Sequence, residues 1–195
     1  LQLCLMTAQI ANGGYKIYPK LSVKDNEDSF EFIKNKIREN LKKKKGLSQT
    51  KDQLLNFIKE TKYKALYKNP KNIKLVQEAM FASTNEPRGT SYKSRIEDKK
   101  YQFAGKTGTS QVKRITEKDR ELDLKTIDIP YNERDHALYV AYGPYKNPRY
   151  SLSVVVEHGG SGSSTAAPIA KKLFKLIIDR HELREKQRNE RLLKI

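Results

Sequence analysis

Four consecutive residues, Lys106, Thr107, Gly108 and Thr109, carry the groups that bind a free carboxylate. A lysine on a strand supplies a fixed positive charge, and the threonine hydroxyls supply hydrogen bonds. The glycine leaves room for an extended peptide to lie against the strand edge. The competing interpretation is an ordinary lysine on an edge strand. The segment therefore predicts a site for the anionic end of a substrate, and it contains no nucleophile.

Two other segments have the spacing of serine nucleophile motifs, Ser48-Gln-Thr-Lys51 and Ser83-Thr-Asn85. A catalytic lysine in Ser-x-x-Lys has to be desolvated before it can act as a base. Ser48 follows four lysines and precedes Asp52, which is typical of an exposed helix N-cap. The second segment falls at the end of a predicted helix. We predict that neither serine is catalytic, and we assign no nucleophile to this chain.

The three histidines and the single cysteine are further candidate functional residues. His136 follows Asp135 at the start of a predicted strand, where we expect it to position the loop beside the Lys106 strand. His158 lies at a strand end and His181 in a charged tail. No cysteine or carboxylate completes a metal-ligand set around them, so we predict no metal. Cys4 lies in an apolar helical run, which favours a buried, inert thiol.

The predicted strands place Lys106 in a sheet. They cover residues 101–112, 136–143 and 149–157, and Pro144–Pro148 supplies a hairpin turn between the last two. Helical patterns precede and follow these strands. The predicted fold is α+β, an antiparallel sheet with flanking helices.

Three helices are expected to flank this sheet. Residues 1–11 are apolar nearly all round, which predicts a buried helix ended by Gly13 and Gly14. A second helix begins at Asn69-Pro70 and ends before Pro87. The turn at 159–164 lacks the ending of a phosphate loop, so we expect a flexible connection to the last helix. The predicted inner stripe of that helix is Ile169, Leu173, Leu176 and Ile177.

The domain organisation follows from two changes in composition. Residues 23–66 are rich in lysine and show helical spacing, which indicates a helical hairpin inserted into a domain of residues 1–180. Beyond Asp179 the chain is charged, so residues 181–195 form a predicted tail that frays or extends into solvent.

The chain is strongly basic, with 40 lysines and arginines, 23 acidic residues and a formal charge of +17. Such a charge favours polyanions. The lysine run at 42–45 lacks interleaved aromatic residues, so we consider nucleic acid an improbable partner and a solvated surface the better interpretation. The alternative function is a basic, non-catalytic binding module for nucleic acid or anionic surfaces, acting through the lysines of residues 34–68. No apolar run approaches the ~20 residues that span a bilayer.

The residues around Lys106 strengthen its assignment. Asn85–Thr90 precede it, and Arg134–Ala137, Tyr139–Tyr145 and Val154–Gly160 follow it in order. This set resembles the C-terminal part of the transpeptidase domain of the penicillin-binding protein 2 family, the class B enzymes of cell elongation. The resemblance covers residues 1–20 and 68–180, and residues 23–66 have no counterpart.

The resemblance implies a peptidoglycan D,D-transpeptidase that crosslinks cell-wall peptides through a serine acyl-enzyme. Lys106 and Thr109 are then catalytic, Lys106 through its charge and Thr109 through a backbone N–H that forms half of an oxyanion hole. Thr107, Gly108 and Thr109 bind the substrate carboxylate.

The same resemblance implies the surroundings of the enzyme. The expected ligands are the D-Ala-D-Ala end of the stem peptide and β-lactams, with no cofactor. The expected partners are membrane proteins of the elongation machinery and the missing N-terminal half of the domain, which carries the nucleophile. The expected location is the periplasmic face of the bacterial inner membrane, with the anchor outside this chain. Without its other half, we expect the chain to expose apolar surface and to be inactive.

Overall fold

The computed structural model describes residues 1–19, 64–113 and 128–192 of the chain. The chain divides into two compact units, Leu1–Gly14 with Tyr67–Ile195, and Tyr15–Leu66. In the described part of the second unit, Tyr15 and Ala65 form an antiparallel bridge. The predicted lysine-rich hairpin and Ser48 lie outside the described residues.

The first unit is built on a three-stranded antiparallel sheet in the order β1-β2-β3. The strands are β1 (Ala104–Ser110), β2 (His136–Gly143) and β3 (Tyr150–Val156). Lys106 pairs with Val140 across β1 and β2. The first strand is shorter than predicted because a turn, closed by the Tyr101 N–H on the Asp98 carbonyl at 3.0 Å, precedes it. The predicted α+β fold with an antiparallel sheet is confirmed.

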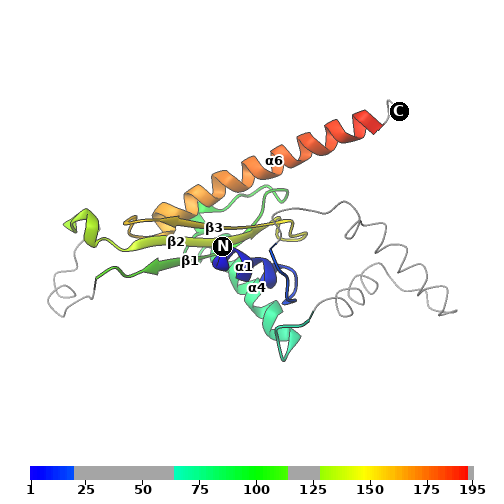
Figure 1. Ribbon diagram of the computed structural model, residues 1–195. Coiled ribbons are helices and arrows are strands. Elements are labelled where there is room, and N and C mark those ends of the chain that lie inside the picture. The colour runs from blue at the N-terminus through cyan, green and yellow to red at the C-terminus, as the bar shows by residue number, and fades with distance from the viewer. Residues whose placement is uncertain (20–63, 114–127, 193–195) are drawn as a thin grey trace. The chain divides into compact units, whose positions relative to one another are not determined.

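Helices lie on both faces of this sheet (Figure 1). Helices α1 (Gln2–Ala11) and α4 (Pro70–Asn85) cover one face, and α6 (Ala167–Leu192) covers the other. Asn69 caps α4, because its Oδ1 accepts from the Lys71 N–H at 3.0 Å. The chain leaves α1 through Gly13 and Gly14, whose φ angles of 95° and 85° favour glycine. Both ends agree with the sequence prediction.

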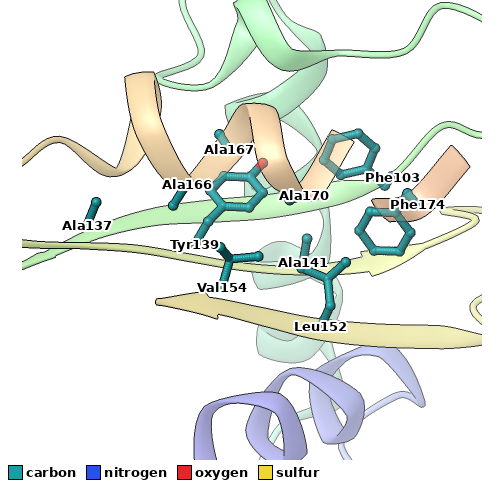
Figure 2. Packing of buried hydrophobic residues seen from close by; sticks show 10 residues of the cluster. All are labelled: Phe103, Ala137, Tyr139, Ala141, Leu152, Val154, Ala166, Ala167, Ala170 and Phe174. Carbon is teal, nitrogen blue, oxygen red and sulfur yellow. The ribbon is translucent and has the colours of Figure 1, made fainter. Parts of the chain in front are cut away.

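The main core lies between the sheet and α6 (Figure 2). Phe103 and Phe174 stack with ring centroids 4.9 Å apart. The predicted inner stripe of α6 is wrong, since Ile169, Leu173 and Leu176 are 40%, 37% and 66% exposed. The helix instead turns its small residues to the sheet, because alanines allow a close approach to β2. The buried residues of α6 are Ala167, Ala170, Phe174 and Ile178.

The prediction that α1 is buried is also wrong. Leu1 and Met6 are 86% and 44% exposed, and within the helix only Thr7 is buried. The helix contacts β2, β3 and α4 through one side, so its opposite apolar side faces solvent. On the packed side Cys4 is half-buried, with its Sγ 3.3 Å from Ser151 Oγ.

One expectation about the C-terminal region, the flexible connection at residues 159–164, also differs from the structure. Gly162 begins a π-helical turn, Gly162–Ala166, that leads into α6. A Cβ at Gly162 would lie 2.4 Å from the Leu138 carbonyl oxygen, so this connection is closely packed against the sheet. The chain beyond Asp179 stays helical to Leu192. Lys100 holds the helix there through Asp179 at 3.6 Å and Glu182 at 2.6 Å. A domain boundary near residue 180 stays a prediction.

Candidate active-site strand and its supporting hydroxyls

Lys106 projects from β1, which forms one edge of the described sheet. Its side chain is exposed, and Nζ donates to the Thr107 carbonyl oxygen at 2.8 Å. The Thr107 hydroxyl lies 3.4 Å from the same Nζ. The structure therefore brings the Lys106 charge and the Thr107 hydroxyl together. Thr109, two residues further along the strand, is exposed.

A row of hydroxyls connects Thr107 to the end of α4. Thr90 Oγ1 lies 3.2 Å from Thr107 Oγ1, and Ser83 Oγ lies 3.1 Å from Thr90 Oγ1. The turn that carries Thr90 is held tightly, because a Cβ at Gly89 would lie 2.3 Å from the Ser83 carbonyl oxygen. This contact explains why the turn has a glycine before Thr90.

Tyr139 fixes this region from within the core. Its hydroxyl lies 2.9 Å from Thr84 Oγ1 and 3.0 Å from Ser91 Oγ. Burial raises the pKa of the Tyr139 phenol, and its hydrogen bonds with Ser91 and Thr84 partly offset that rise. Ser91 Oγ also donates to the Ser83 carbonyl at 3.0 Å. These bonds join α4, the Thr90 turn and β2 into one support for the Lys106 strand.

The two glycines of β1 have different surroundings. A Cβ at Gly105 would lie 2.3 Å from the Tyr139 hydroxyl, so the fold requires a glycine there. A Cβ at Gly108 would meet only Leu138 Cβ, at an ordinary 3.4 Å. Neither packing nor a positive φ requires glycine at position 108. The space beside Gly108, which has no side chain, can therefore be filled by a ligand that lies against the strand.

The far end of the motif strand is held by a second group of contacts. Asp135 Oδ1 accepts from the Val112 N–H at 3.2 Å, and its carbonyl accepts from the Gly160 N–H at 2.8 Å. His136 Nδ1 accepts from the His158 N–H at 2.9 Å. His158 has a φ of 54°, a conformation that non-glycine residues adopt rarely. Asp135 thus makes the side-chain contact with the segment after β1, and the positioning role of His136 stays a prediction.

An open groove of about 550 Å³ lies beside Lys106, between α1, α4 and the sheet. Its walls are largely apolar, and Ser83 and Arg88 also line it. Ser83 thus shares the groove with Lys106, although its hydroxyl is bonded to Thr90. The apolar lining residues include Met6, Ile10, Val76, Met80 and Val140.

Sequence reasoning missed the supporting residues Ser83, Thr84, Thr90, Ser91 and Tyr139. Gly89 and Thr90 entered the prediction only within the Asn85–Thr90 segment of the family resemblance, and Ser83 only within a Ser-x-Asn spacing. Asn85, from the same spacing, donates to the Phe103 carbonyl at 2.9 Å and so joins α4 to the start of β1. The one local signal was the concentration of hydroxyl residues between 83 and 94.

Within residues 1–19, 64–113 and 128–192, no three His, Cys, Asp or Glu side chains are grouped so that they could hold a metal ion. In the same part of the chain no helix combines the length and the apolar character needed to cross a bilayer.

Comparison with known proteins gives the family. The model of the penicillin binding protein transpeptidase domain matches residues 1–175. The chain belongs to this transpeptidase family. A curated relative, the peptidoglycan D,D-transpeptidase MrdA of Salmonella typhimurium, is 41% identical over 105 residues, which are 54% of this chain and 16% of the relative. The MrdA of Haemophilus influenzae is 38% identical over 95 residues, or 49% of this chain and 14% of the relative.

A solved structure confirms the fold of this transpeptidase segment. It is the crystal structure of Pseudomonas aeruginosa penicillin-binding protein 2 in complex with WCK 5153, with a TM-score of 0.55 and 26% identity. The likeness covers 88% of this chain and 28% of that protein. The predicted resemblance to the penicillin-binding protein 2 transpeptidase domain is therefore confirmed. The chain spans only a minor part of the length of these relatives.

Proposed function

We propose that this chain supplies the acyl-donor-binding strand of a serine-type D,D-transpeptidase that crosslinks peptidoglycan. The observation that carries the proposal is the Lys106–Thr107 pair on an edge strand beside a glycine that the fold does not require. The two MrdA relatives are peptidoglycan D,D-transpeptidases by name, which supports the same reaction.

Each residue of the strand has a role in this mechanism. Lys106 and the hydroxyls of Thr107 and Thr109 hold the terminal carboxylate of a D-Ala-D-Ala stem peptide. Gly108 lets the peptide backbone lie against β1. The Thr109 N–H supplies half of an oxyanion hole, and such a donor stabilises the transition state by about 3 kcal/mol.

The nucleophile belongs to another part of the protein, which carries the serine and its lysine base. The exposed apolar groove beside Lys106 supports this division, because a groove of this kind is suited to cover by a further apolar segment. A serine at the Lys106 end of that segment would face the carboxylate site. On its own, the chain is then inactive.

We infer the cellular location, the partners and the inhibitors of the enzyme from its family. It acts at the periplasmic face of the bacterial inner membrane, with membrane proteins of the elongation machinery as partners. β-Lactams occupy the same strand as the stem peptide, since they mimic the acyl donor.

The assignment of the nucleophile is tested by the intact mass of the chain after incubation with benzylpenicillin, with peptide mapping of any adduct. We expect no covalent adduct on the unmodified chain. The matched control is Ser48→Ala. An adduct that forms on the unmodified chain and is lost in this variant would contradict the proposal, because it would make Ser48 the nucleophile.

A further inference from the structure

A second cavity, of about 690 Å³, lies between the segment that precedes β1 and the first turns of α6. It shares no lining residue with the groove beside Lys106. Four lysines line it, Lys93, Lys171, Lys172 and Lys175, against a single acidic residue, Asp98. The lining therefore carries an excess of positive charge.

This charge is not neutralised within the protein. None of the four lysines forms an ion pair in the part of the chain that the structure describes. The acidic groups on the neighbouring surface are already engaged. Lys100 pairs with Asp179 at 3.6 Å and with Glu182 at 2.6 Å, and Arg95 pairs with Glu97 at 2.7 Å. The four lysines at the cavity thus have no ion-pair partner among the described residues, and the Nζ of Lys175 lies 6.0 Å from the centroid of the Tyr101 ring.

Ser94 gives a second, independent indication of a ligand. The residue is only 3% exposed and lines the cavity, yet no hydrogen bond joins its hydroxyl to any side chain or backbone group among the described residues. The hydroxyl is not among the fully buried atoms that lack a partner, so it keeps contact with solvent at the cavity wall. It is therefore free to bond to a molecule in the cavity.

The start of α6 adds favourable electrostatics. Ser163 and Ser164 line the cavity from the helical turn Gly162–Ala166, which continues directly into the 26-residue helix. The first N–H groups of a helix lack intrahelical acceptors, and its dipole favours an anion there. The hydroxyls of Ser163 and Ser164 are themselves bonded to Ser161, so this turn contributes its backbone N–H groups. The lysine charges, the Ser94 hydroxyl and the helix start thus lie at one cavity.

We propose that this cavity binds a phosphate-bearing anion. Four lysines exceed what one carboxylate needs, whereas a phosphate group offers two charges and several acceptor oxygens. The same chemistry is found in an anionic lipid headgroup and in a soluble phosphate compound. The inference does not depend on the proposed transpeptidase function, because Lys106 and its strand take no part in it.

The first test titrates the full chain with inorganic pyrophosphate by calorimetry. We expect saturable binding that weakens by about tenfold or more when Lys172→Ala and Lys175→Ala are combined, since each change removes a charge-assisted hydrogen bond. The matched control combines Lys71→Ala and Lys146→Ala, two exposed lysines outside the cavity, and should bind as the unmodified chain does. Ser94→Ala should weaken binding severalfold.

The second test distinguishes the source of the phosphate. The chain is sedimented with vesicles of phosphatidylglycerol in the presence and absence of pyrophosphate. Vesicles of phosphatidylcholine, which carry no net charge, are the comparison. Binding that pyrophosphate displaces and the cavity variant loses supports a lipid headgroup. Pyrophosphate binding without vesicle binding supports a soluble phosphate. Absence of saturable binding to either probe, or equal weakening in the control variant, would overturn the proposal.

Circular dichroism checks that each variant is folded. Lys172 and Lys175 are exposed, so their replacement leaves the core intact. If Ser94→Ala does not fold, the lysine variants still show whether the cavity binds the phosphate probe.

Discussion

Thr90 Oγ1 lies 3.2 Å from Thr107 Oγ1, which joins a turn outside the motif to the strand that carries Lys106. Ser83 extends this row of hydroxyls into the last turn of α4. A threonine hydroxyl rotates freely unless a partner fixes it, so the contact with Thr90 directs the Thr107 hydroxyl. In the proposed mechanism Thr90 is a positioning residue for carboxylate binding.

Replacing Thr90 should therefore weaken acyl-donor binding without unfolding the protein. The Thr90→Val variant keeps the shape of the side chain and loses its hydroxyl. Loss of the hydrogen bond to Thr107 should cost about 1 kcal/mol of binding free energy, or fivefold to tenfold in affinity for the acyl donor. The measurement is the rate of penicillin acylation against penicillin concentration in a protein that contains this chain and a nucleophile. We expect the apparent binding constant to change more than the limiting rate. Thr90→Ser should restore it, and an unchanged binding constant in the valine variant would refute the role.

The two glycines of β1 should respond in opposite ways to alanine. Gly105→Ala places a methyl group 2.3 Å from the Tyr139 hydroxyl, and we expect a loss of about 1–3 kcal/mol in the free energy of unfolding. Gly108→Ala meets no such contact and should leave stability within about 1 kcal/mol, while it reduces acyl-donor binding. Urea unfolding and penicillin acylation measure the two effects. A Gly108→Ala protein with full acylation would show that the peptide does not lie there.

Two buried tyrosines provide a test of the hydroxyl network. Tyr139→Phe removes both hydrogen bonds of the Tyr139 hydroxyl, to Thr84 and to Ser91, which should cost about 1–3 kcal/mol of folding free energy. The Tyr142 hydroxyl is buried and has no partner among the described residues, so Tyr142→Phe should be neutral or stabilising. Thermal and urea unfolding compare the two variants. Equal destabilisation would mean that the network contributes nothing specific.

The same tyrosines predict how stability depends on pH. Burial raises the pKa of both Tyr139 and Tyr142 above the value of about 10 in the unfolded chain. Above that pH the unfolded chain releases protons that the folded protein retains. Stability should thus be complete below about pH 10 and fall as the pH rises toward the folded pKa values, by at most ~1.4 kcal/mol per pH unit for each tyrosine. Tyr142→Phe should make this decline shallower. An identical slope in the variant would contradict the account.

Much of the fold was predictable because its signals are local. The Asn69-Pro70 start of α4, the Gly13-Gly14 exit from α1 and the alternating β3 strand each depend on neighbouring residues. The Lys106 strand was recognised because it combines a charge, hydroxyls and a glycine within four residues. The Pro144–Pro148 turn likewise predicted the antiparallel hairpin of β2 and β3.

The remaining features depend on contacts between distant residues. Periodicity alone allowed either face of α6 to pack, and the alanine face was selected by how closely the helix approaches β2. The exposed side of α1 could not be foreseen from an apolar composition. Thr90 lies 17 residues from Thr107 and Tyr139 lies 48 from Ser91, so no local pattern connects them.

The most direct test places this chain in the corresponding segment of Pseudomonas aeruginosa penicillin-binding protein 2 and measures acylation by a fluorescent penicillin. We predict that the chimera is acylated, and that Lys106→Ala reduces the second-order acylation rate about 100-fold or more, because the carboxylate loses its fixed positive charge. Lys146→Ala, an exposed lysine in the β2–β3 turn, should leave the rate unchanged. A folded chimera that is acylated equally well with and without Lys106 would contradict the assignment of β1 as the acyl-donor strand.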